Sequence, residues 1–141
     1  MHRFRRFRAC TQGVSAVEFA LIAPIFLMLV FGIITYGGYL AVMYGVQQLT
    51  AAAARSSIAG LSDTERSNLA TTYVNSNVNS YPLLAASNVT VNAAASPSNA
   101  NVFVVTVNYN ASGLFIYSLP KFVPTPPTTV VSSAAIPRGG F

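Results

Sequence analysis

Few residues in this chain could do chemistry, and most of them lie near its N-terminal end. His2 is the only histidine and Cys10 the only cysteine, and the acids are Glu18, Asp63 and Glu65. One cysteine cannot form an internal disulfide, and a serine nucleophile needs a neighbouring base. The sequence shows no glycine-rich phosphate loop, no metal-ligand cluster and no nucleophile–base pair. It therefore predicts no enzyme, no cofactor, no metal site and no small-molecule substrate.

Two of the three acids have a structural explanation. Residues 62–65 read SDTE, the pattern of a capping box, which predicts that a helix starts at about Asp63 and runs to about Asn75. Asp63 and Glu65 then belong to its first turn. Glu18 has no such explanation, because it stands at the start of a long run that carries no other charge.

That run is the most unusual part of the chain. The chain is 52% hydrophobic and only 8% charged, whereas soluble domains carry about 25% charged residues. No charge occurs from Phe19 to Val46, which is longer than the ~20 residues that span a bilayer. The run also exceeds the ~7–15 apolar residues of a signal peptide, so we expect a retained membrane anchor in contact with lipid. Cleavage at the AAAA of 51–54 is the alternative.

The basic residues set the expected orientation. Four of the eight, Arg3, Arg5, Arg6 and Arg8, lie before the apolar run, and positive charge flanking a span stays in the cytoplasm. The N-terminus should be cytoplasmic and residues from about 50 onward should lie outside. The rest of the chain is nearly neutral, which argues against nucleic acid as a partner.

Two features within the span concern packing between helices. Pro24 removes one backbone hydrogen bond, which membrane helices tolerate where neighbours satisfy the freed carbonyl. Gly37, Ala41 and Gly45 recur every four residues, so one face is small enough for another helix to approach closely.

The outer part reads as α+β. The first helix should continue to about Ala59 with Gly60 as its cap. Alternating residues predict three strands, at 88–93, 101–109 and 128–136. In the middle strand the face of Phe103, Val105, Val107 and Tyr109 should pack on the outer half of the first helix. The apolar loop 113–127 is either satellite core or an exposed contact for lipid or another subunit.

The N-terminal segment resembles the processing signal of prepilins: a basic leader, Gly13, then Glu18 followed by an aromatic, Phe19. The resemblance implies a prepilin peptidase that cuts between Gly13 and Val14. Residues 1–13 would be a leader that is removed, 14–59 a long helix that is transmembrane to about 46, and 60–141 an extracytoplasmic α+β domain. In a bundle of such helices, the new ammonium of one subunit needs a partner, and the carboxylate of Glu18 in a neighbour neutralises it.

The start VSAVEF differs from the FTLIE-like start of type IV pilins. The string GVSAVEFALIAPIFLMLVFGI is similar instead to the TadE-like family of the tight-adherence (Tad) pilus, whose hallmarks here are Gly13, Val17, Glu18, Phe19, Ala20, Leu21 and Pro24. This resemblance implies a pilin-like fold and a minor pilin or pseudopilin of a Tad/Flp pilus, used for pilus biogenesis and adhesion. Its partners would be other Tad pilins and assembly proteins. It would reside in the bacterial inner membrane as a single-pass protein, or in the pilus.

An alternative keeps the membrane anchor without the pilus. The chain would then be an unprocessed single-pass membrane protein whose outer domain is an interaction module of the envelope. The two hypotheses differ in the first residue of the mature protein and in the need for Glu18.

Overall fold

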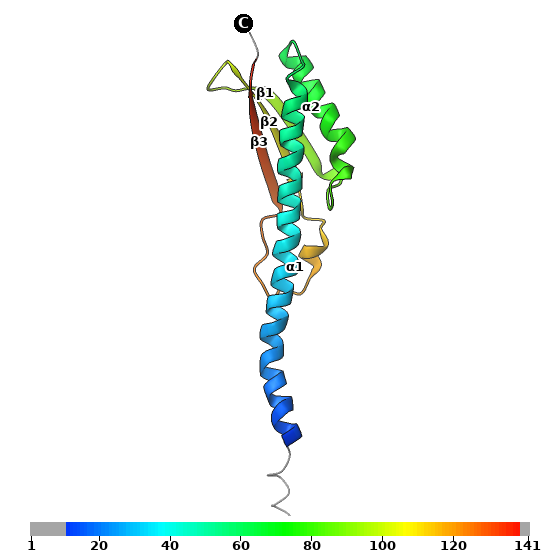
Figure 1. The fold of residues 1–141 in the computed structure, drawn as a ribbon, viewed down its shortest axis with the longest axis vertical. Coiled ribbons are helices and arrows are strands. Elements are labelled where there is room, and N and C mark those ends of the chain that lie inside the picture. The colour runs from blue at the N-terminus through cyan, green and yellow to red at the C-terminus, as the bar shows by residue number, and fades with distance from the viewer. Residues whose placement is uncertain (1–10, 139–141) are drawn as a thin grey trace, which may run out of the picture.

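The structure, a computed structural model, describes the backbone of residues 11–138 and the side chains from Gly13 onward (Figure 1). Two helices and a three-stranded sheet make up the fold, with single 3₁₀ turns in the connections. The helices are α1 (Thr11–Ser57) and α2 (Asp63–Asn77), and the strands are β1 (Val89–Ala95), β2 (Val102–Asn110) and β3 (Thr129–Pro137). This arrangement confirms the predicted α+β class.

Helix α1 has 47 residues, which corresponds to a length of ~70 Å. It runs without interruption through Pro24. It ends at Ser57, whose hydroxyl donates to the Ala54 carbonyl at 2.7 Å. Gly60 is not the left-handed cap that the sequence predicts, because no described glycine has a positive φ. A Cβ on Gly60 would lie 2.6 Å from Cγ of Arg66, so this glycine permits close packing of the turn against α2.

The capping box at the start of α2 is present. The Glu65 amide donates to Oγ of Ser62 at 3.2 Å, and the Leu61 amide donates to Oε2 of Glu65 at 2.9 Å. The first bond satisfies an amide that an isolated helix end leaves without a partner, and the second engages the amide of the residue before the Ser62 cap. They also hold the turn by which the chain reverses direction after α1.

The sheet is antiparallel in the order β1-β2-β3, so β2 is the central strand. Val89 lies opposite Tyr109 in one pair, and Phe103 lies opposite Ile136 in the other. Each strand begins one residue later than the sequence predicts, but the alternation is as expected. Phe103, Val105, Val107 and Tyr109 are all buried.

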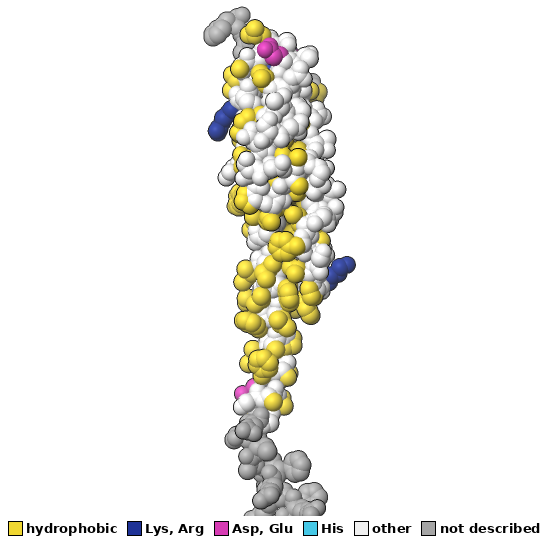
Figure 2. All heavy atoms as spheres, turned by 90° about the vertical axis from the view of Figure 1, so that its right-hand side faces the viewer, with side chains coloured by type: hydrophobic (Ala, Val, Ile, Leu, Met, Phe, Trp, Pro, Cys, Tyr) yellow, Lys and Arg dark blue, Asp and Glu magenta, His cyan; other side chains and the backbone are white. Residues whose placement is uncertain are grey.

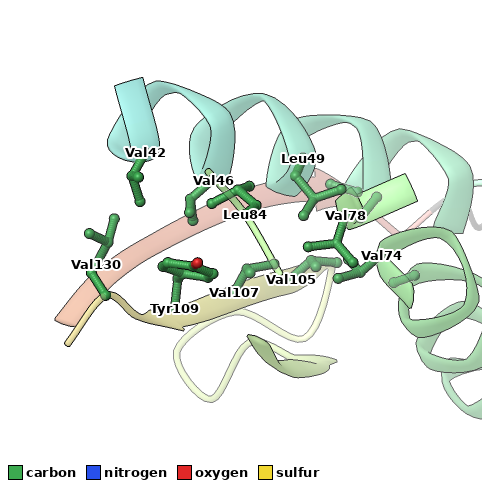
Figure 3. Packing of buried hydrophobic residues seen from close by; sticks show 14 of the residues in the cluster. Val42, Val46, Leu49, Val74, Val78, Leu84, Val105, Val107, Tyr109 and Val130 are labelled. Carbon is green, nitrogen blue, oxygen red and sulfur yellow. The ribbon is translucent and has the colours of Figure 1, made fainter. Parts of the chain in front are cut away.

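The core lies between the sheet and the two helices (Figure 3). Val42, Val46 and Leu49 of α1 face the buried side of β2, and Val74 and Val78 close the core from α2 and the turn after it. The sheet thus packs on the outer part of α1, as predicted.

The packed part of α1 begins earlier than the sequence suggests. Val42 and Val46 belong to the uncharged run for which the sequence predicts a membrane location, yet both are fully buried under the sheet. An apolar side chain suits a protein core as well as lipid, so the run itself does not mark the change of environment. The part of α1 that the domain leaves uncovered is correspondingly shorter.

Candidate functional site

The N-terminal part of α1 stands free of the rest of the molecule (Figure 1). Figure 2 shows hydrophobic side chains gathered over this lower part, whereas the folded domain above has far fewer. Twelve large hydrophobic side chains are exposed between Val14 and Ile34. At ~1.5–3 kcal/mol for each side chain, covering them is worth on the order of 20 kcal/mol. That exceeds the usual ~5–15 kcal/mol stability of a domain, so this surface requires lipid or other helices.

The same segment is long and apolar enough to cross a membrane. Within the most apolar window of the candidate span Gly13–Ser57, none of the residues is buried inside the protein. A buried core helix is therefore excluded. Cleavage at 51–54 is unfavourable as well, because Ala53 and Ala54 are buried in the packed part of α1, one turn before its end at Ser57. Such a cut would separate Val42 and Val46 from the sheet that they pack against.

Glu18 lies near the base of this uncovered helix with its side chain exposed. Within residues 11–138 its carboxylate forms no ion pair; the salt bridge found there joins Arg138 to Asp63. The neighbours Val14, Val17 and Phe19 are exposed and apolar. The carboxylate is thus free to meet a cation from outside the described chain.

The peptide bond between Gly13 and Val14 lies within α1, and both residues are exposed. The residues from Met1 to Cys10, including His2 and the four arginines, lie outside the described part of the chain.

One face of the uncovered helix forms a shallow apolar hollow, lined by Phe19, Ile22, Ala23, Phe26 and Leu27. Pro24 lies beside this hollow and has no amide hydrogen, so the carbonyl of Ala20 lacks its usual helical donor. The surface is shaped to receive side chains of a neighbouring helix or lipid tails. Nothing polar lines it.

The predicted face of small residues divides into two parts. Gly45 is buried, and a Cβ placed on it would lie 3.3 Å from Cδ1 of Leu84. It therefore serves packing within the chain. Gly37 and Ala41 are exposed, and nothing lies within 4 Å of a Cβ on Gly37, which leaves these two available to a helix of another subunit.

The loop 113–127 packs against α1 just below the sheet. Ile116 is buried against Gly38, and the ring of Phe122 stacks on Phe31 with centroids 5.6 Å apart. The Tyr36 hydroxyl donates to the Pro124 carbonyl at 3.1 Å. Of the two interpretations of this loop, satellite core holds for Ile116, while Phe115 and Phe122 stay half exposed.

Tyr117 forms a hydrogen bond within the loop, since its hydroxyl donates to the Pro127 carbonyl at 2.6 Å. Partial burial raises the pKa of Tyr117 above the ordinary tyrosine value, and the nearby Tyr39 raises it further. The neutral, donating form is thus the one that the loop favours. Sequence reasoning identified the apolar loop but not its contact with residues 31–38 of α1, which lie far away in the chain.

The remaining polar groups are engaged in holding the fold. A small polar hollow at the far end of the domain is lined in part by Asp63, Arg66 and Arg138. Nε of Arg66 donates to the Gly60 carbonyl at 2.9 Å, and Arg138 pairs with Asp63. Among residues 11–138 no three metal-ligating side chains come together. The uncovered helix is therefore the candidate functional site.

Comparison with known proteins gives a match over part of the chain. Residues 13–55 match the model of a protein family described as TadE-like protein. No curated protein and no solved structure matches the chain. The matched segment covers the uncovered part of α1 and most of the part under the sheet, and stops before α2. The similarity to the TadE-like family is thereby confirmed over residues 13–55.

Proposed function

We propose that this protein is a minor pilin or pseudopilin of a Tad pilus assembly system, working in pilus biogenesis and adhesion. The observation that carries the proposal is the uncovered apolar half of α1, which lies within the TadE-like segment. Before assembly this half would span the bacterial inner membrane, with the N-terminus in the cytoplasm and the sheet domain outside. During assembly, helices of other pilins would replace the lipid.

Processing after Gly13 is the first step of this proposal. A prepilin peptidase would remove residues 1–13 and leave Val14 with a free ammonium group. The exposure of Gly13 and Val14 supports the step. The remaining chain would consist of the helix from Val14 and the extracytoplasmic domain, and Phe19 and Pro24 would contribute to recognition by the peptidase and to packing.

Glu18 would then act as the partner of that ammonium. It lies one helical turn after Val14, so the two charges of one chain can meet, and in a bundle a neighbour's carboxylate can take the same place. A carboxylate in the middle of a membrane helix costs ~2.5–3.5 kcal/mol. Pairing lowers the cost for both charges, since a buried charge without a partner is strongly unfavourable. Gly37 and Ala41 would let neighbouring helices approach.

The test begins with the N-terminal residue of the protein isolated from membranes of its host. A chain that starts at Val14 supports processing. A chain that starts at Met1 in the presence of the peptidase refutes it and supports the alternative, an unprocessed anchor with an envelope interaction module.

A pair of variants tests the role of Glu18. Glu18→Gln keeps the size and removes the charge, so we expect normal cleavage but loss of the protein from sheared pili. Glu65→Gln is the matched control, since it makes the same change at an exposed acid of the outer domain. Equal incorporation of both variants would contradict the assembly role of Glu18.

A further inference from the structure

We propose that the loop 113–127 is a membrane contact that rests in the outer headgroup layer, and that phospholipid covers its exposed aromatic side chains. The proposal depends on the membrane anchoring proposed above and adds a second point of attachment. It concerns a part of the chain that the TadE-like match does not cover.

The position of the loop along α1 is the first argument. The loop touches α1 from Phe31, which stacks on Phe122, to Gly38, which meets Ile116. The uncovered helix from Val14 to Phe31 measures ~26 Å, and a hydrocarbon core is ~30 Å thick. The loop thus meets α1 close to the level where the helix leaves the hydrocarbon. Figure 1 shows the connection between β2 and β3 reaching from the sheet toward the uncovered end of α1.

The backbone of the loop sharpens this placement. Apart from one 3₁₀ turn at Phe115–Ser118, residues 113–127 form no helix or strand. Irregular backbone that faces lipid cannot lie in hydrocarbon, because its amides and carbonyls would lack partners. The hydrocarbon must therefore end where the loop begins, while side chains can still reach below that level.

The exposed side chains of the loop have the chemistry of a membrane interface. Phe115 is 51% and Phe122 49% exposed, and the Lys121 side chain lies exposed next to Phe122. Residues 113–127 contain no acid that would repel phosphate groups. Aromatic rings favour the boundary between water and hydrocarbon, and a lysine can extend its ammonium to lipid phosphates. The hydroxyls of Tyr36 and Tyr117 donate hydrogen bonds to two carbonyls of the loop, those of Pro124 and Pro127.

Tryptophan fluorescence can test the contact, because the chain contains no tryptophan. Phe115→Trp and Phe122→Trp each place one reporter on the loop at a half-exposed position. The full chain is reconstituted at low density in phosphatidylcholine–phosphatidylglycerol vesicles. The lipids carry bromine either near the glycerol end or near the methyl end of their acyl chains. Ile22→Trp reports on the middle of the span, since Ile22 is exposed and lies ~14 Å along the helix from Phe31. Leu61→Trp reports on the opposite end of the domain, where Leu61 is 94% exposed.

We expect the loop reporters to lose more emission to the shallow bromine than to the deep one. Ile22→Trp should show the reverse order, and Leu61→Trp should lose almost nothing. If both loop reporters behave like Leu61→Trp while Ile22→Trp is quenched, the loop faces water or protein and the proposal is overturned. Stronger quenching by the deep bromine than by the shallow one at both loop positions would also overturn it. If Ile22→Trp is not quenched, the proposed membrane anchoring itself fails.

Discussion

Gly37 and Gly38 are neighbours in α1 with opposite surroundings. Comparing an alanine substitution at each position therefore distinguishes the effect of alanine on helix stability from its effect on the contact between α1 and the loop. A Cβ on Gly37 meets nothing within 4 Å, whereas a Cβ on Gly38 would lie 2.9 Å from Cγ2 of Ile116. Carbon atoms pack at ~3.5–4.0 Å, so Ile116 would have to retreat by ~0.6–1 Å. Its branched side chain is stiff and cannot turn away easily.

Both substitutions change the free energy of unfolding through helix propensity, but only Gly38→Ala also overpacks the contact with Ile116. Replacing glycine by alanine inside a helix gains ~1 kcal/mol in both cases. Overpacking at Gly38 costs ~1–3 kcal/mol. We therefore expect Gly37→Ala to raise the free energy of unfolding by ~1 kcal/mol, and Gly38→Ala to leave it unchanged or lower it by up to ~2 kcal/mol. The difference of ~1–3 kcal/mol measures the contact with the loop.

Denaturant unfolding of both variants in the same detergent micelles measures this difference. Hydrogen exchange at the Tyr117 amide, which donates to the Leu114 carbonyl at 3.1 Å, reports on the loop itself and should speed up only in Gly38→Ala. In an Ile116→Ala background the clash is absent, so Gly38→Ala should then stabilise as Gly37→Ala does. Equal stabilities of the two single variants, with unchanged exchange, would refute the contact.

Three further changes in the outer domain have predictable effects on the free energy of unfolding. Leu83 has φ of 65°, so Leu83→Gly should relieve ~1 kcal/mol of backbone strain, visible as a higher denaturation midpoint. Gly60→Ala should destabilise by more than ~1 kcal/mol, since the added Cβ meets the backbone amide of Arg66 at 2.7 Å. Ser62→Ala should cost ~1 kcal/mol by removing the cap of α2, and Ser67→Ala, in the body of α2, is its control.

The sheet and its buried face follow from sequence because a strand that packs on one side must alternate. Phe103, Val105, Val107 and Tyr109 could only share one face, and the charge-free helix was the one apolar surface long enough to cover them. The start of α2 was equally predictable, since the SDTE pattern satisfies local amides irrespective of the rest of the fold.

Long-range contacts explain what the sequence left undetermined. Ile116 and Phe115 are adjacent and both apolar, yet Ile116 is buried and Phe115 half exposed. Both lie next to Gly38 of α1, where an added Cβ would be 2.9 Å from Ile116 and 3.9 Å from Phe115. Leu83 gives no local sign of its positive φ. That conformation accompanies a hydrogen bond of 2.9 Å from the Tyr109 hydroxyl to the Leu83 carbonyl.

The end of the candidate span was undetermined for a related reason. Val42 and Val46 look like membrane residues until the sheet is placed over them. The change from lipid-facing to core-facing residues along α1 occurs without any charged residue to mark it, since none stands between Glu18 and Arg55.

In the proposed arrangement, Glu18 and the loop 113–127 together restrict how far α1 can shift along its axis across the bilayer. The helix is continuous between Glu18 and Phe31, so the carboxylate lies ~20 Å along the axis from the start of the loop contact. With the loop at the outer headgroups, Glu18 lies ~20 Å into a ~30 Å core, which leaves ~10 Å of hydrocarbon between the carboxylate and the cytoplasmic interface and makes the lone charge costly. Moving the helix inward by a turn would push irregular backbone into hydrocarbon, and moving it outward would draw the carboxylate away from water. In the proposed function, the subunit would leave this position in the bilayer only when neighbouring helices replace the lipid and an ammonium group of one of them pairs with the Glu18 carboxylate.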